Sequence, residues 1–163
     1  MGLYFYQTDI GKIGIAEQSG SITNLYFAED PVPQDSDLCE TPILKEAAQQ
    51  LYAYLSGTIE EFNLPLAPAG TVFMKQVWAS LCEIPYSKTA SYKEIAVRVG
   101  NPKAARAVGL ANNRNPIPIF IPCHRVVGAN GSLTGYRGGL DLKQRLLIME
   151  QRKAKIKADR DSI

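Results

Sequence analysis

Short apolar runs separated by turn residues occupy the start of the chain and predict strands. The runs at 3–8 and 12–17 are rich in apolar and aromatic residues and are joined by a short turn, which is typical of a β-hairpin. A third strand is expected over 21–28. The residues that follow, 29–41, are acidic and contain two prolines, so we expect a loop there.

Apolar residues then recur at helical spacing, which predicts two helices. The first follows Thr41-Pro42, where threonine can act as the N-cap and proline can occupy the first helical position, and Gly57 can end it. The second helix covers about 72–82 and can be capped by Thr71. Its expected buried stripe consists of Val72, Val77, Trp78 and Leu81.

The stretch 62–70 contains two prolines and indicates a strand end or a linker. With 163 residues the chain is long enough for one domain or two small ones. We expect two, a β-rich scaffold domain over residues 1–68 and a largely helical domain over 69–163. The fold class is therefore predicted to be α+β.

A helix-turn-helix is predicted over 91–112. Ser91 and Glu94 have the spacing of a capping box, which opens the first helix. A glycine ends that helix, and Asn101-Pro102 can cap and start the second. Two short helices joined by such a turn fit a DNA-binding motif, and they fit a packed helical hairpin without a DNA role equally well. The expected core contacts are Ile95, Ala96, Val99, Ala105, Val108 and Leu110.

The second of these helices is unusual for one that reads bases. Its residues are mostly small and apolar, and Arg106 is the long polar side chain among them. Helices that read the major groove usually carry several side chains that bond base edges. A helix of small residues with one arginine suits a close approach to a groove and the insertion of that side chain.

Charge is distributed unevenly along the chain, although the net charge is only +2. Residues 1–65 hold two basic and ten acidic residues, whereas residues 88–125 hold seven basic residues and one acidic residue. Residues 126–163 add eight basic and four acidic residues. Such asymmetry suggests that the second half faces a polyanion, and a chance segregation of surface charges explains it equally well.

Composition excludes several classes of protein. Hydrophobic residues make up 45% of the chain and charged residues 21%, which excludes disorder along its whole length. No apolar run approaches the roughly 18 residues of a membrane span, and residues 1–10 lack the features of a secretory signal. Three cysteines, which cannot all pair with each other, fit a reducing compartment. One histidine and three scattered cysteines also argue against a protein-ligated zinc site.

The segment 115–127 carries the strongest chemical signal. Three prolines, at 116, 118 and 122, exclude a helix and predict an extended, buried path that ends at Cys123. His124 and Arg125 follow at once, and a thiol beside two potential cations is expected to have a lowered pKa. Cys123 is thus either an activated nucleophile or a structural cysteine at the end of a buried strand.

Together these motifs resemble those of the O6-alkylguanine-DNA alkyltransferases, also called methylated-DNA–protein-cysteine methyltransferases. The resemblance extends over about 71–150. It rests on Ser91-Tyr92, Asn101-Pro-Lys-Ala-Ala-Arg-Ala-Val108, Asn115-Pro, Pro122-Cys-His-Arg-Val126 and Gly135-Tyr-Arg-Gly-Gly139. It implies that the β-rich first part is the family's variable, RNase H-like domain.

The resemblance implies a direct-reversal repair reaction. Cys123 would take an alkyl group irreversibly from O6-alkylguanine, or less readily from O4-alkylthymine, once per molecule. His124 would be its base, acting through a bound water, and Glu150 would orient the histidine. Asn115 matches the side chain that ties the active-site turn together, and Tyr92 matches the proton donor to the departing guanine.

The resemblance also implies how the DNA is bound. Arg106 matches the arginine that fills the gap left by the extruded base. The loop 128–139, with Tyr136, Arg137 and Gly138, matches the loop that closes over that base, with the Arg137 amide as donor to O6. Where some relatives carry tryptophan, Gly138 leaves room for bulkier adducts. Further DNA contacts are expected from Ser91, Lys103 and Arg125.

The partner would be double-stranded DNA that contains O6-alkylguanine, bound by a cytoplasmic, nucleoid-associated monomer. Neither a cofactor nor a metal is expected, because the zinc ligands of some relatives are missing. Two other functions remain open. The chain could be a helix-turn-helix lesion sensor or regulator with an idle cysteine, or a cysteine hydrolase that uses Cys123, His124 and Glu150.

Overall fold

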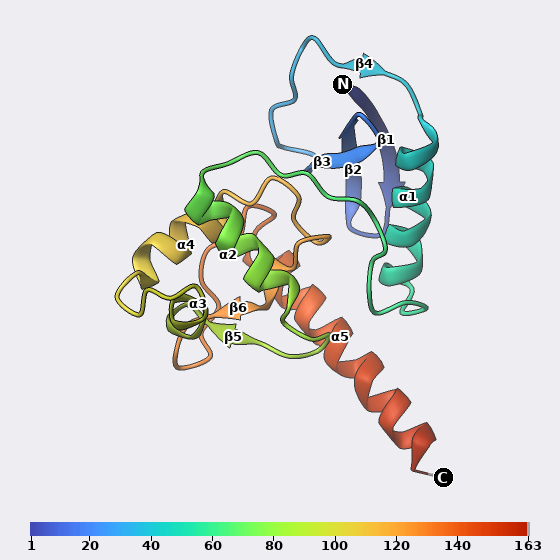
Figure 1. Cartoon of the computed structure of the whole chain (residues 1–163). Helices are drawn as coiled ribbons and strands as arrows, with labels where there is room; N and C mark the ends of the chain where they lie inside the picture. The colour runs from blue at the N-terminus through green and yellow to red at the C-terminus, as the bar shows by residue number, and fades with distance from the viewer. Residues whose placement is uncertain (163) are drawn as a thin grey trace. The chain divides into compact units, whose positions relative to one another are not determined.

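The computed structural model describes residues 1–162 and forms two compact units (Figure 1). The first unit contains Met1–Ala69 together with Pro116–Phe120, and the second contains Gly70–Asn115 and 121–162. A single division near residue 68 therefore does not describe the chain fully. A short segment from the second half returns to complete the first unit.

The first unit is built on a four-stranded sheet in the order β3-β2-β1-β4. β1 (Gly2–Thr8) and β2 (Gly11–Gln18) form the predicted hairpin, and β3 (Ser21–Tyr26) adds a third antiparallel strand. The stretch expected to be only a loop contains β4 (Asp37–Leu38), which pairs in parallel with β1. The acidic loop therefore also closes one edge of the sheet.

Helix α1 (Pro42–Leu55) packs its apolar stripe against this sheet, alongside β1 and β2 (Figure 1). Thr41 occupies the N-cap position as expected, but its hydroxyl makes no capping hydrogen bond. Gly57 follows the helix with a positive φ of 79°, the conformation that glycine supplies at a helix end. The helix buries Leu44, Ala47, Ala48, Leu51 and Tyr54.

The segment 116–120 is held in the first unit by backbone and ring contacts. The Pro116 carbonyl accepts a hydrogen bond from the Leu25 amide at 2.9 Å, and the ring of Phe120 lies 4.8 Å from that of Phe62. The predicted extended path is interrupted by a turn, where Ile119 has φ 74°. A β-branched residue rarely adopts that conformation, so burial of the Ile119 side chain holds a strained turn shortly before Cys123.

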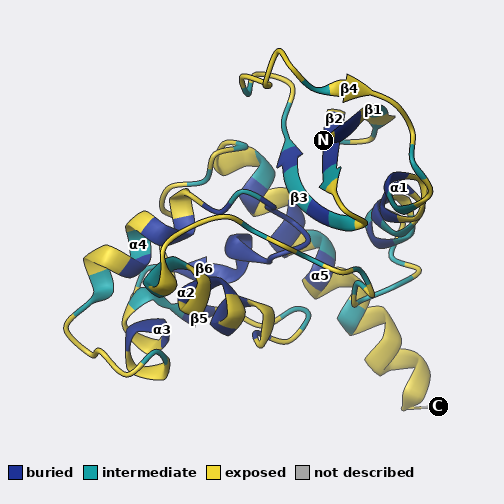
Figure 2. Cartoon of the chain, turned by 45° about the horizontal axis from the view of Figure 1, so that its top comes forward, coloured by how far each residue is buried: buried dark blue, intermediate teal, exposed yellow. Residues whose placement is uncertain are grey.

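The second unit is mainly helical. It contains α2 (Val72–Cys82), β5 (Ala90–Ser91), α3 (Tyr92–Arg98), α4 (Ala105–Asn113), the 3-10 turn Cys123–Arg125, β6 (Val126–Val127) and α5 (Leu140–Asp161). The basic end of the chain belongs to α5, which continues through Asp161. Figure 2 shows buried positions in the first half of α5 and exposed ones along its end.

Trp78 forms the centre of the packing between α2 and α4. Its side chain is 2% exposed, and its indole N–H donates a 2.9 Å hydrogen bond to the carbonyl of Ala111. A Cβ added at Gly70 would lie 2.5 Å from the Trp78 ring, so glycine is required there. Two predicted core residues are exposed instead: Val72 at 75%, in the first turn of α2, and Leu110 at 50%, on the outer face of α4.

Candidate active site and nucleic-acid interface

The helix-turn-helix begins with the capping box that the sequence predicts. The Ser91 hydroxyl accepts from the Glu94 amide at 3.1 Å, and the Glu94 carboxylate accepts from the Ser91 amide at 3.3 Å. The start of the second helix was predicted wrongly. After Gly100, the backbone carbonyl of Asn101 accepts a hydrogen bond from the Ala104 amide, which closes a turn. Helix α4 begins only after this turn, at Ala105.

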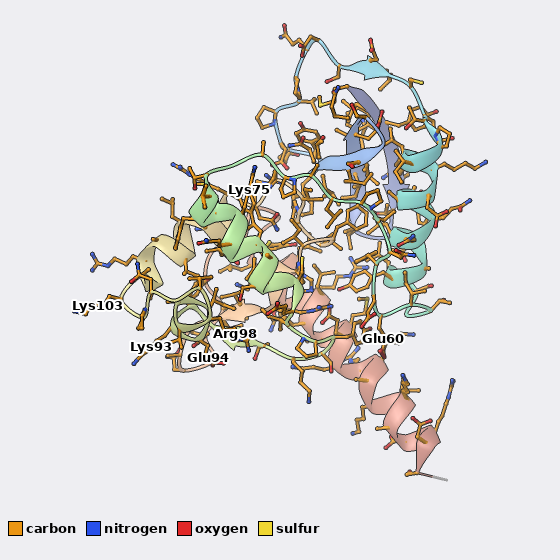
Figure 3. All side chains as sticks on the ribbon, in the orientation of Figure 1. Glu60, Lys75, Lys93, Glu94, Arg98 and Lys103 are labelled. Carbon is orange, nitrogen blue, oxygen red and sulfur yellow. The ribbon has the colours of Figure 1, made fainter. Side chains whose placement is uncertain are left out.

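Exposed basic side chains surround these helices. Arg106 lies exposed on α4, and Lys103 lies exposed in the turn before it. Lys93 and Arg98 project from α3, and Figure 3 shows them gathered with Lys103 around α3 and this turn. Lys93 and Arg98 were not predicted as DNA contacts from the sequence, although both belong to the seven basic residues counted over 88–125. The surface can neutralise several phosphates.

A two-stranded parallel sheet joins the helix-turn-helix to the Cys-His-Arg segment. Ala90 pairs with Val126 and Ser91 pairs with Val127. Tyr92 directly follows β5, and Cys123–Arg125 directly precedes β6, so the pairing brings the first turn of α3 close to the Cys-His-Arg turn. Ser91 therefore has a structural role, because it caps α3 and pairs with Val127 in the small sheet.

Cys123 is the first residue of the 3-10 turn and is 3% exposed. Asn115, itself buried, donates from its side-chain amide to the Ile121 carbonyl at 2.9 Å and also hydrogen-bonds the Cys123 thiol. Asn112, on α4, donates to the Cys123 carbonyl at 3.3 Å. Asn112 was not predicted from the sequence, because no local pattern around an asparagine in a helix indicates a contact with a residue 11 positions away.

Glu150 on α5 receives hydrogen bonds from three sides in a buried network. His124 Nε2 lies 2.7 Å from one carboxylate oxygen. Arg125 binds the same carboxylate through Nε at 2.9 Å and Nη2 at 3.0 Å, and its Nη1 donates to the Ile84 carbonyl. The Ser87 amide donates to the carboxylate at 3.0 Å. The predicted histidine–glutamate pair is present in this arrangement.

Arg125 was predicted to contact DNA, and the structure contradicts this. Its side chain is buried, and the bonds to Glu150 and Ile84 engage all three of its guanidinium nitrogens. A guanidinium that is buried and pairs with a carboxylate through two nitrogens is not accessible to a phosphate. Its role is to hold Glu150 in place.

Burial and pairing set the protonation states of this network. Burial alone would raise the pKa of Glu150, but the hydrogen bonds and charges of His124 and Arg125 outweigh it and lower the pKa to about 2. Burial lowers the pKa of His124 below its usual 6.5, against the opposing effect of Glu150. We therefore infer a neutral imidazole that donates from Nε2 to Glu150, which leaves Nδ1 as the basic nitrogen.

The thiol of Cys123 does not have the lowered pKa that its neighbours in the sequence suggested. Burial raises its pKa to about 11, although the Asn115 hydrogen bond and the charges of Lys143 and Arg137 act in the opposite direction. The expectation failed because burial opposes ionisation and because the charge of Arg125 is engaged by Glu150. The resting site therefore holds a protonated thiol that needs a base.

The segment 128–139, the loop before α5, carries the remaining predicted residues. Tyr136 and Gly138 are half-buried, and Arg137 is exposed. Burial raises the pKa of Tyr136 well above its usual range, and the charge of Cys123 acts in the same direction. The loop also carries Thr134, whose hydroxyl lies 2.6 Å from that of Tyr92.

Two classes of site are not found in residues 1–162. No group of three or more histidine, cysteine, aspartate or glutamate side chains is arranged to hold a metal ion there. In the same residues, none of the helices has the length and apolar character needed to cross a membrane.

Comparison with known protein families assigns both parts of the chain. The family model for the DNA binding domain of 6-O-methylguanine DNA methyltransferase matches residues 72–152. The family model for the ribonuclease-like domain of 6-O-methylguanine DNA methyltransferase matches residues 3–68. The RNase H-like first part and the α+β fold expected from the sequence are confirmed.

Individual relatives are similar to this chain in sequence over nearly their whole length. A methylated-DNA–protein-cysteine methyltransferase of Methanosarcina barkeri is 52% identical over 148 residues, which cover 89% of this chain and 94% of that protein. A constitutive one of Bacillus subtilis is 45% identical over 152 residues, covering 89% and 92%. The crystal structure of Mycobacterium tuberculosis OGT in complex with DNA matches with a TM-score of 0.89 at 42% identity, covering 94% of each chain.

Proposed function

The chain belongs to the O6-methylguanine DNA methyltransferase family, and we propose that it repairs DNA by moving an alkyl group from guanine O6 to its own Cys123. The observation that carries the proposal is the buried Cys123 followed by the His124–Glu150 pair, in the same unit as a helix-turn-helix. O4-alkylthymine would be a poorer substrate. The expected partner is double-stranded DNA, bound by a monomer inside the cell, where thiols stay reduced.

The protonation states support a specific order of proton transfers. Cys123 enters the reaction as a thiol, and its proton passes through a bound water to Nδ1 of the neutral His124. Glu150 then stabilises the imidazolium. The sulfur attacks the alkyl carbon, the bond from that carbon to O6 breaks, and Tyr92 donates a proton to the departing guanine. The product is a thioether, which water does not cleave, so we expect each molecule to react once.

A base stacked in a duplex cannot reach a buried sulfur, so the target nucleotide has to be turned out of the helix. Extrusion costs a few kcal/mol. Arg106, exposed on a helix of small residues, is suited to fill the gap and offset part of that cost. Lys93, Arg98 and Lys103 would contact phosphates and position the duplex. The half-buried Gly138 leaves room over the base for adducts larger than methyl.

Mass spectrometry after incubation with an O6-methylguanine oligonucleotide tests the proposal. We expect the protein to gain the mass of one CH₂ group, located in the peptide that contains Cys123, with no more than one methyl removed per molecule. Retained DNA binding with no mass change would favour the lesion sensor instead. Turnover of acyl esters, without a stable adduct, would favour the hydrolase.

Replacing Arg106 tests how the base leaves the helix. An Arg106→Ala variant should transfer the methyl group roughly 10- to 100-fold more slowly from duplex DNA, because the gap left by the extruded base is no longer filled. Transfer from single-stranded DNA should change far less. Arg114→Ala, which removes an exposed arginine just after α4, is the matched control. Equal losses on duplex and single-stranded DNA would contradict this role.

A further inference from the structure

Thr134 connects two groups at the active site through separate atoms. Its hydroxyl lies 2.6 Å from the hydroxyl of Tyr92, and its carbonyl accepts a 2.7 Å hydrogen bond from the Lys143 ammonium. Tyr92 comes from α3 and Lys143 from α5, whereas Thr134 belongs to the loop 128–139. One loop residue thus links the helix-turn-helix to the helix that carries Glu150.

Lys143 is an unusual residue to find in this place. Its side chain is fully buried, and burial lowers its pKa to about 8, partly opposed by the neighbouring Cys123. Burying a lysine is costly unless its ammonium is bonded. The Thr134 carbonyl provides that bond, so the position of the loop and the burial of Lys143 depend on each other.

We propose that Thr134 is a positioning residue for alkyl transfer: its hydroxyl orients the Tyr92 hydroxyl while the Lys143 ammonium fixes the Thr134 backbone. The inference rests on the proposed role of Tyr92 as the proton donor to guanine. Either hydroxyl can donate in this pair, and the proposal assigns Thr134 as the donor. The Tyr92 hydroxyl hydrogen is then directed elsewhere, towards a guanine in the site. Accepting that bond also stabilises the negative charge that develops on the phenol oxygen as it donates.

The arrangement separates the two functions of Thr134 between side chain and backbone. Removing the hydroxyl leaves the carbonyl, and hence the bond to Lys143, in place. The Thr134 side chain is exposed, so a change there does not disturb the core. Thr134→Val, which keeps the branched shape, therefore removes the contact to Tyr92 alone.

Single-turnover kinetics with O6-methylguanine duplex DNA test the inference. Thr134→Val should lower the rate of methyl transfer at saturating DNA about 10-fold, the loss expected for one well-aligned hydrogen bond, while the DNA Kd stays within twofold. Thr134→Ser, which restores the hydroxyl, should recover most of the rate. Thr58→Val, the same substitution at an exposed threonine of the first unit, is the matched control and should react at the wild-type rate.

A double-mutant cycle with Tyr92→Phe distinguishes positioning from a general effect on the loop. If Thr134 acts through the Tyr92 hydroxyl, Thr134→Val should have no further effect on the rate once that hydroxyl is gone. Equal effects of Thr134→Val in both backgrounds would overturn the inference, as would an unchanged rate in the single variant. Absence of transfer by the wild-type protein would instead overturn the proposed function itself.

Discussion

A Cys123→Ser protein should bind alkylated DNA normally and transfer no alkyl group, with a loss in rate of at least about 1000-fold. A serine hydroxyl is far less acidic and less nucleophilic than a thiol, and the neutral His124 is too weak a base to ionise it. The side chains are similar in size, so the packing around the buried position should survive. Release of label from a methyl-labelled oligonucleotide and the intact protein mass measure the effect.

The matched control for this variant is Cys39→Ser. Cys39 is an exposed cysteine in the first unit, so its replacement should leave the amount and the rate of methyl transfer unchanged. Continued removal of methyl groups by Cys123→Ser would show that another atom is the acceptor. It would also remove the basis for the order of proton transfers described above.

Glu150→Gln should lower the free energy of unfolding by about 3–5 kcal/mol, the usual cost of leaving one member of a buried ion pair without its partner. The amide cannot accept from both sides as the carboxylate does, so Arg125 would remain charged and buried without a counter-ion. His124 would lose the group that orients it, and methyl transfer should slow. Urea denaturation measures the stability, and Glu61→Gln, an exposed carboxylate, should have almost no effect.

Acid should reveal the same interaction in the wild-type protein. The pKa of Glu150 is about 2 in the folded chain against an ordinary 4.5, so its ionised form favours folding. That stability is fully present above about pH 4.5 and is lost as the pH falls through 2. Glu150→Gln has no such group to titrate. The difference in stability between the two proteins should therefore shrink on acidification, and parallel pH curves would contradict the role of Glu150.

Local signals in the sequence predicted local structure well. The capping box of Ser91 and Glu94 and the cap by Thr71 are read from spacing alone, because each involves residues three apart in the chain. The apolar stripe of α1 and the hairpin of β1 and β2 follow from periodicity in the same way. Adjacent motif residues such as Cys123 and His124 were likewise available from the sequence.

What the sequence did not show depends on contacts between distant residues. Arg125 was expected to contact DNA from the resemblance, and its burial against Glu150 arises only when α5 packs onto the Cys-His-Arg turn. Lys143 was overlooked because a lysine near the start of an amphipathic helix usually lies on its exposed face. The raised pKa of Cys123 follows from burial, which the order of residues cannot measure.

Trp78 is the only tryptophan in the sequence, and it lies in the unit that contains Cys123. Its indole is buried and bonded to the Ala111 carbonyl of α4, so its fluorescence emission should move to longer wavelength when α2 and α4 separate. The eight tyrosines are spread over both units. Tryptophan emission in a denaturation experiment would therefore report the second unit alone, and comparison with circular dichroism would show whether the two units unfold together or in turn.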